Sequence, residues 1–169
     1  MTTTPVDAFE QSLTDLPVRV TRTTVAEFDE MLESCLDPPA VGVSLPFETI
    51  SLDDHPVTVD PTADELLSAT TGVTPGGPAI AEYGSVVVTS EFDGTEHTSL
   101  YPDKHVIVLA ASDIVPTLAN AISEIEEGID DGLTSAVITT GPSATADMGA
   151  PVYGAHGPED VHVLVLTDR

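Results

Sequence analysis

Basic residues are scarce in this chain. Its 169 residues include four Lys and Arg against 29 Asp and Glu, which gives a formal net charge of −25 at pH 7. The four cations are scattered along the chain, so they form no basic patch that would meet a phosphate backbone. Nucleic acid and anionic membrane surfaces are therefore poor candidates for partners.

Cysteine, aromatic residues and long apolar runs are also scarce. Cys35 is the single cysteine, so the chain has no internal disulfide and cannot by itself ligate an iron–sulfur cluster or a Cys-rich zinc site. Aromatic residues make up 4% and Trp is absent, which leaves a core of Val, Leu, Ile and Ala. No apolar run approaches about 18 residues, and no basic-then-apolar N-terminal signal is present. We therefore expect a cytoplasmic protein that does not span a membrane.

The acidic residues are spread between apolar segments instead of being gathered in polar blocks. Hydrophobic residues make up 41% of the chain, enough for a core, whereas a disordered acidic chain has few of them. At molar salt the Debye length is about 3 Å, so self-repulsion of such a surface is largely screened. The composition indicates one folded domain over residues 1–169, from a salt-adapted organism.

Local signals in the first half predict helices and one strand. Residues 5–14 are typical of a short surface helix. Capping-box pairs, Thr24 with Glu27 and Thr62 with Glu65, predict helices over residues 24–35 and 62–69. Residues 40–45, AVGVSL, are a candidate strand.

The second half predicts a sheet. SVVVTSEF and TEHTSLY flank Asp93-Gly94, a pattern that favours a β-hairpin over residues 85–101. HVIVLAA then leads into a helix with Ser112 as its expected N-cap, and SAVITT and VHVLVLT are further strands. Because these strands are apolar on both faces, they predict an α/β fold: an open, mostly parallel sheet with helices on both faces and an attached β-hairpin.

Ligands of such sheets gather at the carboxyl edge, outside the carboxyl ends of the strands. We expect residues 139–143, residues 111–113 and Asp168 to lie together at that edge. His105 and His162 stand at the starts of their strands and should lie at the opposite edge. The five histidines show no spacing typical of a metal site.

Three ordered motifs resemble those of LUD-domain proteins of the lactate utilization protein C group. They are GVTPGGPAIAEYGS from Gly72, PDKHVIVL from Pro102, and TGPSATADM from Thr140 with GAHGPEDVHVLVL from Gly154. The resemblance covers residues 72–168 in order and is more specific than a lone glycine-rich loop. It implies a fold similar to that of sugar-phosphate isomerases and CoA transferases.

The resemblance also implies partners. The better-known members belong to a three-protein system that oxidises L-lactate to pyruvate, in which the other two subunits carry iron–sulfur motifs. This chain, with one cysteine, resembles the partner that binds no cluster or other cofactor. It departs from the family at Ala144, where a basic residue is usual, at Gly149, where an acid is usual, and at Tyr83.

The motifs supply the candidate site residues. Ser143 lacks the G-x-S-x-G context of a nucleophile, so we favour it as a hydroxyl that donates to a ligand or caps a turn. Asp147 either anchors the loop or serves the site, and His156 either approaches a ligand or is an ordinary turn residue. Glu82 matches the acid of the family's ETG motif and is the candidate general base. The residues expected to bind ligand are Thr74, Gly84, Ser85, Thr140, Gly141, Ser143, Thr145, Asp147, His156 and Gly157.

Two functions remain open at this point. In the first, the chain is a non-redox subunit of an iron–sulfur lactate-oxidising complex and binds a small anionic metabolite, with the GPSATADM loop presenting donors to a carboxylate or phosphate. In the second, it is a free-standing isomerase-like or CoA-transferase-like enzyme acting on such a metabolite. The shortage of cations favours the first. The glycines of the loop also fit a tight crossover that binds nothing.

Overall fold

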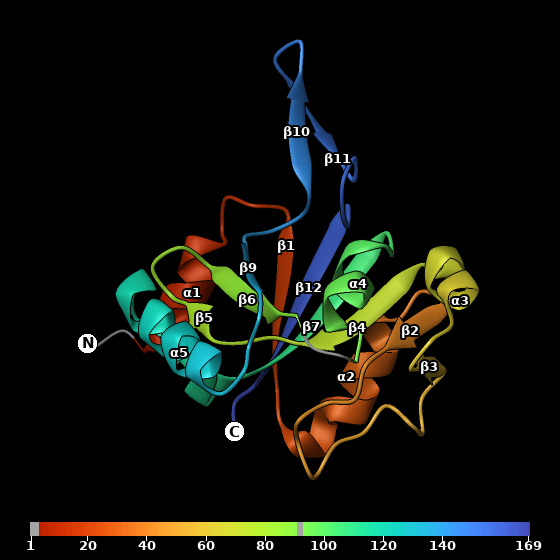
Figure 1. Ribbon diagram of the computed structural model, residues 1–169, viewed down its shortest axis with the longest axis horizontal. Coiled ribbons are helices and arrows are strands. Elements are labelled where there is room, and N and C mark those ends of the chain that lie inside the picture. The colour runs from red at the N-terminus through yellow and green to blue at the C-terminus, as the bar shows by residue number, and fades with distance from the viewer. Residues whose placement is uncertain (1–3, 91–92) are drawn as a thin grey trace.

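The computed structural model describes residues 4–90 and 93–169, apart from the side chain of Asp147. Its centre is a six-stranded sheet, all of whose pairings are parallel, in the order β1-β12-β7-β4-β2-β3 (Figure 1). The strands are β1 (Val18–Thr23), β2 (Ala40–Gly42), β3 (Val57–Val59), β4 (Thr71–Pro75), β7 (Lys104–Ala110) and β12 (Asp160–Leu166). The predicted parallel sheet is confirmed.

The central strands β7 and β12 are buried on both faces, as their apolar sequences predict. Val108 and Leu164 pack on the face covered by α2, against Phe28 and Leu32. The alternate residues of the two strands, such as Ile107, face the other side of the sheet. This alternation follows from the two-residue period of a strand.

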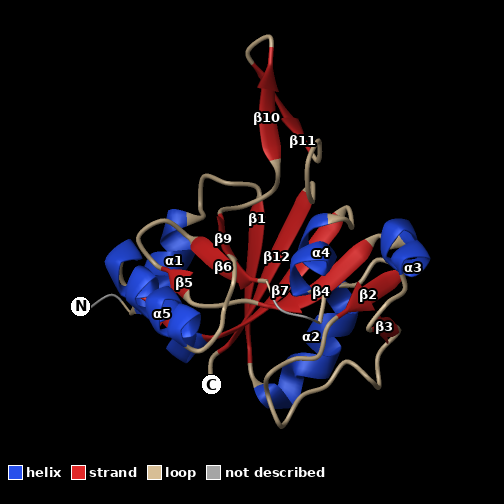
Figure 2. Cartoon of the chain, in the orientation of Figure 1, coloured by secondary structure: helices blue, strands red, loops and turns tan. Residues whose placement is uncertain are grey.

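The described residues form five α-helices, which lie around the sheets (Figure 2). The segments predicted over residues 5–14 and 62–69 are helical, and each begins with a capping box, at Thr4 and at Thr62. The segment predicted over residues 24–35 starts as a 3-10 turn before α2. The helices are α1 (Pro5–Ser12), α2 (Phe28–Cys35), α3 (Ala63–Ser68), α4 (Thr95–Leu100) and α5 (Leu118–Asp130). No helix among the described residues is long and apolar enough to cross a membrane.

A second, four-stranded sheet has the order β8-β5-β6-β9. β5 pairs parallel with β8 and antiparallel with β6, and β6 pairs antiparallel with β9. Residues of this sheet share a core cluster with α1 and with one face of the parallel sheet. Its strands are β5 (Ala79–Ile80), β6 (Ser85–Thr89), β8 (Ile114–Val115) and β9 (Ala136–Thr139).

The hairpin predicted around Asp93-Gly94 is wrong. β6 occupies its first half, residues 91–92 lie outside the described residues, and its second half is helix α4. Gly94 has a φ of 83° at the N-cap, and the Asp93 carboxylate accepts a hydrogen bond from the Thr95 N–H at 3.0 Å. A left-handed glycine after a capping aspartate therefore starts a helix here instead of closing a hairpin.

Ser112 is likewise not the cap that was predicted. It lies in a short 3-10 turn, β8 follows, and Thr117 caps α5. Pro116 favours an extended conformation for the residue before it, so the helix starts after the proline.

An attached hairpin does exist, later in the chain. β10 (Ala144–Asp147) and β11 (Ala150–Tyr153) pair antiparallel and project from the body of the protein (Figure 1). Met148 and Gly149 form the turn with φ of 50° and 85°, the pattern of a type I′ hairpin. The glycine-rich stretch after β9 is therefore largely a projecting hairpin.

Candidate functional site

The segment after β9 lies at a different edge from the predicted one. Residues 139–143 do not join residues 111–113 at the carboxyl edge of the parallel sheet, because β9 belongs to the small sheet. The Ser143 N–H donates to the Pro158 carbonyl at 2.8 Å, in the turn that leads into β12. This segment therefore reaches the entry edge, where β7 and β12 begin, and the prediction is wrong for it.

A cavity of about 260 Å³ opens at this edge. It brings together the start of β7, the turn after β9 and the turn before β12, which carry the second motif and the two parts of the third. Helix α4 and β6 complete its wall. The lining residues are Val88, Glu96, Ser99, Leu100, His105, Val137, Thr139, Thr140, Gly141, Pro142, Ser143, His156, Gly157 and Pro158. The α4 residues were missed by the sequence because their segment was assigned to a strand.

His105 is a buried, neutral polar group of this cavity. Its Nε2 lies 2.8 Å from Oγ1 of Thr74, which is fully buried on the neighbouring strand β4. Burial lowers the pKa of His105 to about 3, because an imidazolium ion loses its hydration there. The ring therefore acts as a neutral hydrogen-bonding group whose orientation Thr74 holds.

Main-chain hydrogen bonds and close packing hold the turn that carries Thr140 and Ser143 in place. The Ser143 carbonyl accepts from the Gly154 N–H at 2.9 Å. A Cβ on Gly157 would lie 3.1 Å from Cβ of Ser143. The absence of a side chain at Gly157 therefore lets the two turns pack closely. Thr140 Oγ1 lies 2.5 Å from Oγ of Ser85, which anchors the turn to the small sheet.

Other predicted site residues lie elsewhere. Thr145 is exposed on the projecting hairpin. The side chain of Asp147 lies outside the described part of the structure, so its expected role stays a prediction. Glu82 is exposed and accepts a hydrogen bond from the Leu118 N–H at 2.7 Å, so it caps α5. Gly84 packs against α1, where a Cβ would meet the Leu13 side chain at 2.5 Å. The catalytic role of Glu82 stays a prediction.

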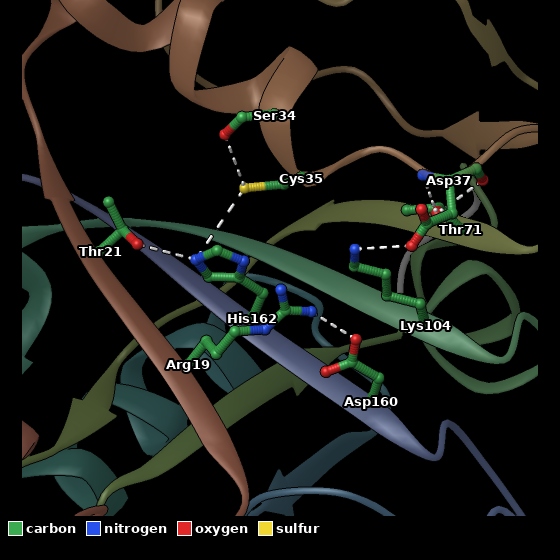
Figure 3. Close-up of polar contacts among 9 residues, drawn as sticks. All are labelled: Arg19, Thr21, Ser34, Cys35, Asp37, Thr71, Lys104, Asp160 and His162. Carbon is green, nitrogen blue, oxygen red and sulfur yellow. Dashed lines mark hydrogen bonds and ion pairs between the residues drawn. The ribbon is translucent and has the colours of Figure 1, made fainter.

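No Lys or Arg is among the described residues that line the cavity. Lys104 precedes His105 on β7, so its side chain leaves the opposite face of the sheet, where Nζ pairs with the Asp37 carboxylate at 2.8 Å (Figure 3). Arg19 pairs with Asp160 at the same edge. These cations are therefore matched by carboxylates, and the cavity has hydroxyl and imidazole groups instead.

His162 lies in the cluster drawn in Figure 3, on the face of the sheet that carries Lys104. Its Nε2 lies 2.8 Å from Oγ1 of Thr21 and 3.9 Å from Sγ of Cys35. Burial, followed by the neighbouring cations, lowers the pKa of His162 to about 4, and burial raises the pKa of the Cys35 thiol. Both groups are held in their neutral forms, so they form no activated thiolate–imidazolium pair.

A second cavity, of about 510 Å³, lies at the carboxyl edge of the parallel sheet, beside the end of β4. Asp113, which the sequence placed at this edge, and Glu124 of α5 both line it. Burial raises the pKa of each carboxyl group, and for Glu124 repulsion from Asp113 adds to the effect. Glu124 was missed by the sequence, because nothing in the helix pattern distinguishes it from its acidic neighbours.

Comparisons with known proteins agree with this architecture. A protein from Bacillus licheniformis named lactate utilization protein C is 36% identical over 105 residues, 60% of this chain and 44% of that protein. One of the same name from Deinococcus radiodurans is 27% identical over 94% of this chain and 77% of its own length. The crystal structure of a DUF162 family protein from Deinococcus radiodurans has a TM-score of 0.74 at 22% identity, covering 96% of both chains, so the two share a fold.

The match to the Bacillus protein spans less than half of that relative's length. The family itself is nevertheless clear, because the LUD domain model matches residues 47–166, most of the chain and all of the cavity's lining residues. This chain belongs to the LUD domain family.

Proposed function

We propose that this chain is a cytoplasmic, non-redox subunit of a lactate utilization system that oxidises lactate to pyruvate. Relatives named lactate utilization protein C support a role in lactate utilization. In this proposal the iron–sulfur clusters are carried by partner subunits. A chain with one cysteine, which is buried, suits a partner that carries no cluster.

The observation that carries the proposal is the meeting of three motif-bearing segments at one cavity. His105, Ser143 and Gly157 are separated along the chain, yet they line the same 260 Å³ space. Hydrogen bonds to Thr74 and Ser85 hold the His105 imidazole and the Thr140 hydroxyl. Ser143 adds a further hydroxyl that can donate or accept. In this proposal the cavity binds a small anionic metabolite that carries a carboxylate, such as lactate or pyruvate.

The charge balance limits the affinity. None of the described residues that line the cavity is a cation that could pair with a carboxylate, and Glu96 adds a negative charge to its wall. Neutral hydrogen bonds contribute about 1 kcal/mol each, so binding should be weak in dilute buffer and stronger in molar salt, where repulsion is screened.

Calorimetric titration with L-lactate, pyruvate and phosphate in molar potassium chloride tests the ligand. Ser143→Ala should weaken carboxylate binding about fivefold, the loss of one hydrogen bond of about 1 kcal/mol. Thr58→Ala, which removes an exposed hydroxyl from β3 outside the cavity, should leave the affinity unchanged. Absence of binding by the wild type, or equal effects of the two substitutions, would overturn ligand binding at this cavity.

The subunit role has a separate test. The purified chain should show no lactate-dependent dye reduction, and activity should appear when iron–sulfur partner subunits are added. Lactate oxidation by the chain alone would contradict a non-redox role.

A free-standing enzyme acting on a small anionic metabolite is the second candidate. The carboxyl-edge cavity favours it, because Asp113 and Glu124 line it with raised pKa values, as general acids and bases do. Isomerase or CoA-transferase activity that Asp113→Asn abolishes and Ser143→Ala spares would support this candidate over the first.

A further inference from the structure

The projecting hairpin and β9 lie in an almost uncharged part of a strongly acidic chain. Residues 132–158 contain one of the chain's 29 acidic residues, Asp147, and no Lys or Arg. We call this segment the uncharged band. Residues 66–90 also contain one acid, Glu82, and no Lys or Arg, but few of them are exposed. The band is the longest part of the sequence with so little charge, and most of its strand residues are exposed.

Large apolar side chains of the band are exposed. Met148 at the hairpin turn is fully exposed, and Val152 and Tyr153 on β11 are 42% and 44% exposed. Val137 and Ile138 on β9 are 46% and 42% exposed. Scattered exposed apolar residues are ordinary, but several of them within one short stretch of chain, on the hairpin and on the edge strand that precedes it, indicate an interaction surface.

The apolar surface continues from the band onto the body of the protein. A Cβ on Gly141 would lie 3.8 Å from the Leu16 side chain, and one on Gly157 would lie 3.4 Å from that of Leu100. Leu16 and Leu100 are themselves 39% and 45% exposed. The base of the hairpin is thus flanked by apolar groups from two other segments.

The strands of the band also have unpaired edges. Among the described residues, β10 and β11 pair only with each other, and β9 is the last strand of the small sheet. Proteins usually protect such edges with charged side chains or proline. The hairpin strands carry Asp147 and Pro151, whereas β9, with the sequence AVIT, has neither. At β9 an unprotected edge therefore occurs together with exposed apolar side chains.

We infer that the uncharged band is the contact surface for a second copy of this chain. A basic partner would be met best by the acidic surface that covers the rest of the protein, whereas an acidic partner must be met where acids are absent. A second copy carries a net charge of −25 and is an acidic partner by its composition. A twofold contact places each band against the other band and keeps the acidic surfaces apart.

This inference does not rest on the proposed ligand, although Val137 and residues 139–143 and 156–158 of the band also contribute to the wall of the entry-edge cavity. It explains why the band lacks the charge of the other surfaces and why its hairpin projects. Molar salt should favour the dimer, because screening lowers the remaining repulsion while apolar contacts persist.

Sedimentation equilibrium in molar potassium chloride provides the test. The wild type should have a mass near twice 17.6 kDa. Tyr153→Asp, which puts a charge on the band, should raise the dimer dissociation constant at least tenfold. Leu67→Asp adds the same charge to another exposed apolar position, on α3, and should leave the dimer intact.

Circular dichroism would verify that both variants fold. A wild type that stays monomeric at every concentration, or a dimer that both substitutions weaken equally, would overturn the inference. A monomeric result would direct attention to a different acidic protein as the partner.

Discussion

Acid should destabilise this protein through His105. Burial lowers the pKa of this imidazole to about 3 in the folded protein, whereas an exposed imidazole in the unfolded chain has a pKa of about 6.5. Below pH ~6.5 the unfolded state binds a proton that the folded state does not, so stability falls as the pH approaches the folded pKa. Above pH ~6.5 the group is neutral in both states and contributes no pH dependence.

The free energy of unfolding should fall by about 1.4 kcal/mol for each pH unit below ~6.5. Between pH ~6.5 and ~4.5 the loss is about 3 kcal/mol, a large share of the stability of an ordinary domain. His162, with its pKa lowered to about 4, acts in the same direction. Asp113 and Glu124 act in the opposite direction, because their raised pKa values make protonation favour the folded state.

Comparison with a variant separates His105 from these other groups. Urea unfolding of the wild type and of His105→Gln would be measured between pH ~7 and ~4.5 in molar potassium chloride, which screens the surface repulsion. The amide of Gln can still bond Thr74 but does not titrate. The stability difference between the two proteins should change by about 1.4 kcal/mol per pH unit below ~6.5, in favour of the variant.

His97→Gln provides the matched control, because His97 is exposed. It makes the same substitution outside the buried core, so a change of equal size in this variant would show that the effect is not specific to His105. A stability difference between the wild type and His105→Gln that stays constant across this range would refute the assignment of His105 as a buried, neutral group.

Three further outcomes are expected. The melting temperature should rise steeply as potassium chloride goes from about 0.1 M, where the Debye length is about 10 Å, to molar concentrations, and a constant value would contradict a salt-adapted surface. Ala144→Arg, which restores the family's usual cation beside the cavity turn, should strengthen lactate or phosphate binding by about 1 kcal/mol in a calorimetric titration; unchanged binding would indicate that the turn holds no anion. Glu82→Ala removes the acceptor of the Leu118 N–H and should lower the free energy of unfolding by about 1 kcal/mol in urea, whereas unchanged stability would show that this cap is dispensable.

Elements with a complete local signal were predictable from the sequence. Thr62 and Glu65 form the capping box that their spacing predicted, and α3 follows. The apolar residues on both faces of β7 and β12 specified a parallel sheet, because no other common arrangement buries both faces. In each case the decisive interactions lie within a few residues of one another or repeat along one strand.

Elements whose signals fit two structures were not predictable. Asp93-Gly94 fits a hairpin turn and also fits a capped helix start, and the buried side chains Thr95 and Thr98 of α4 are consistent with the helix. Ser112 and Thr117 are both suitable N-caps, and the choice follows from Pro116. These outcomes depend on packing against distant strands.

The position of the candidate site depended on one pairing. Had β9 joined the parallel sheet, Ser143 would have lain at the carboxyl edge, as predicted. Its antiparallel pairing with β6 moves the turn to the entry edge beside His105. The residues that meet there were named from the sequence, but their meeting place was set by a contact between segments about fifty residues apart.

The central claim is that a small carboxylate binds in the entry-edge cavity. Titration of the isotope-labelled protein with L-lactate in molar potassium chloride, followed by amide chemical shifts in NMR spectra, tests it most directly. The account predicts saturable shifts at His105, Ser143 and Gly157, which line that cavity, and a dissociation constant about fivefold higher in Ser143→Ala. Shifts confined to Gly77 and Asp113 at the carboxyl edge, or no shifts at all, would contradict it.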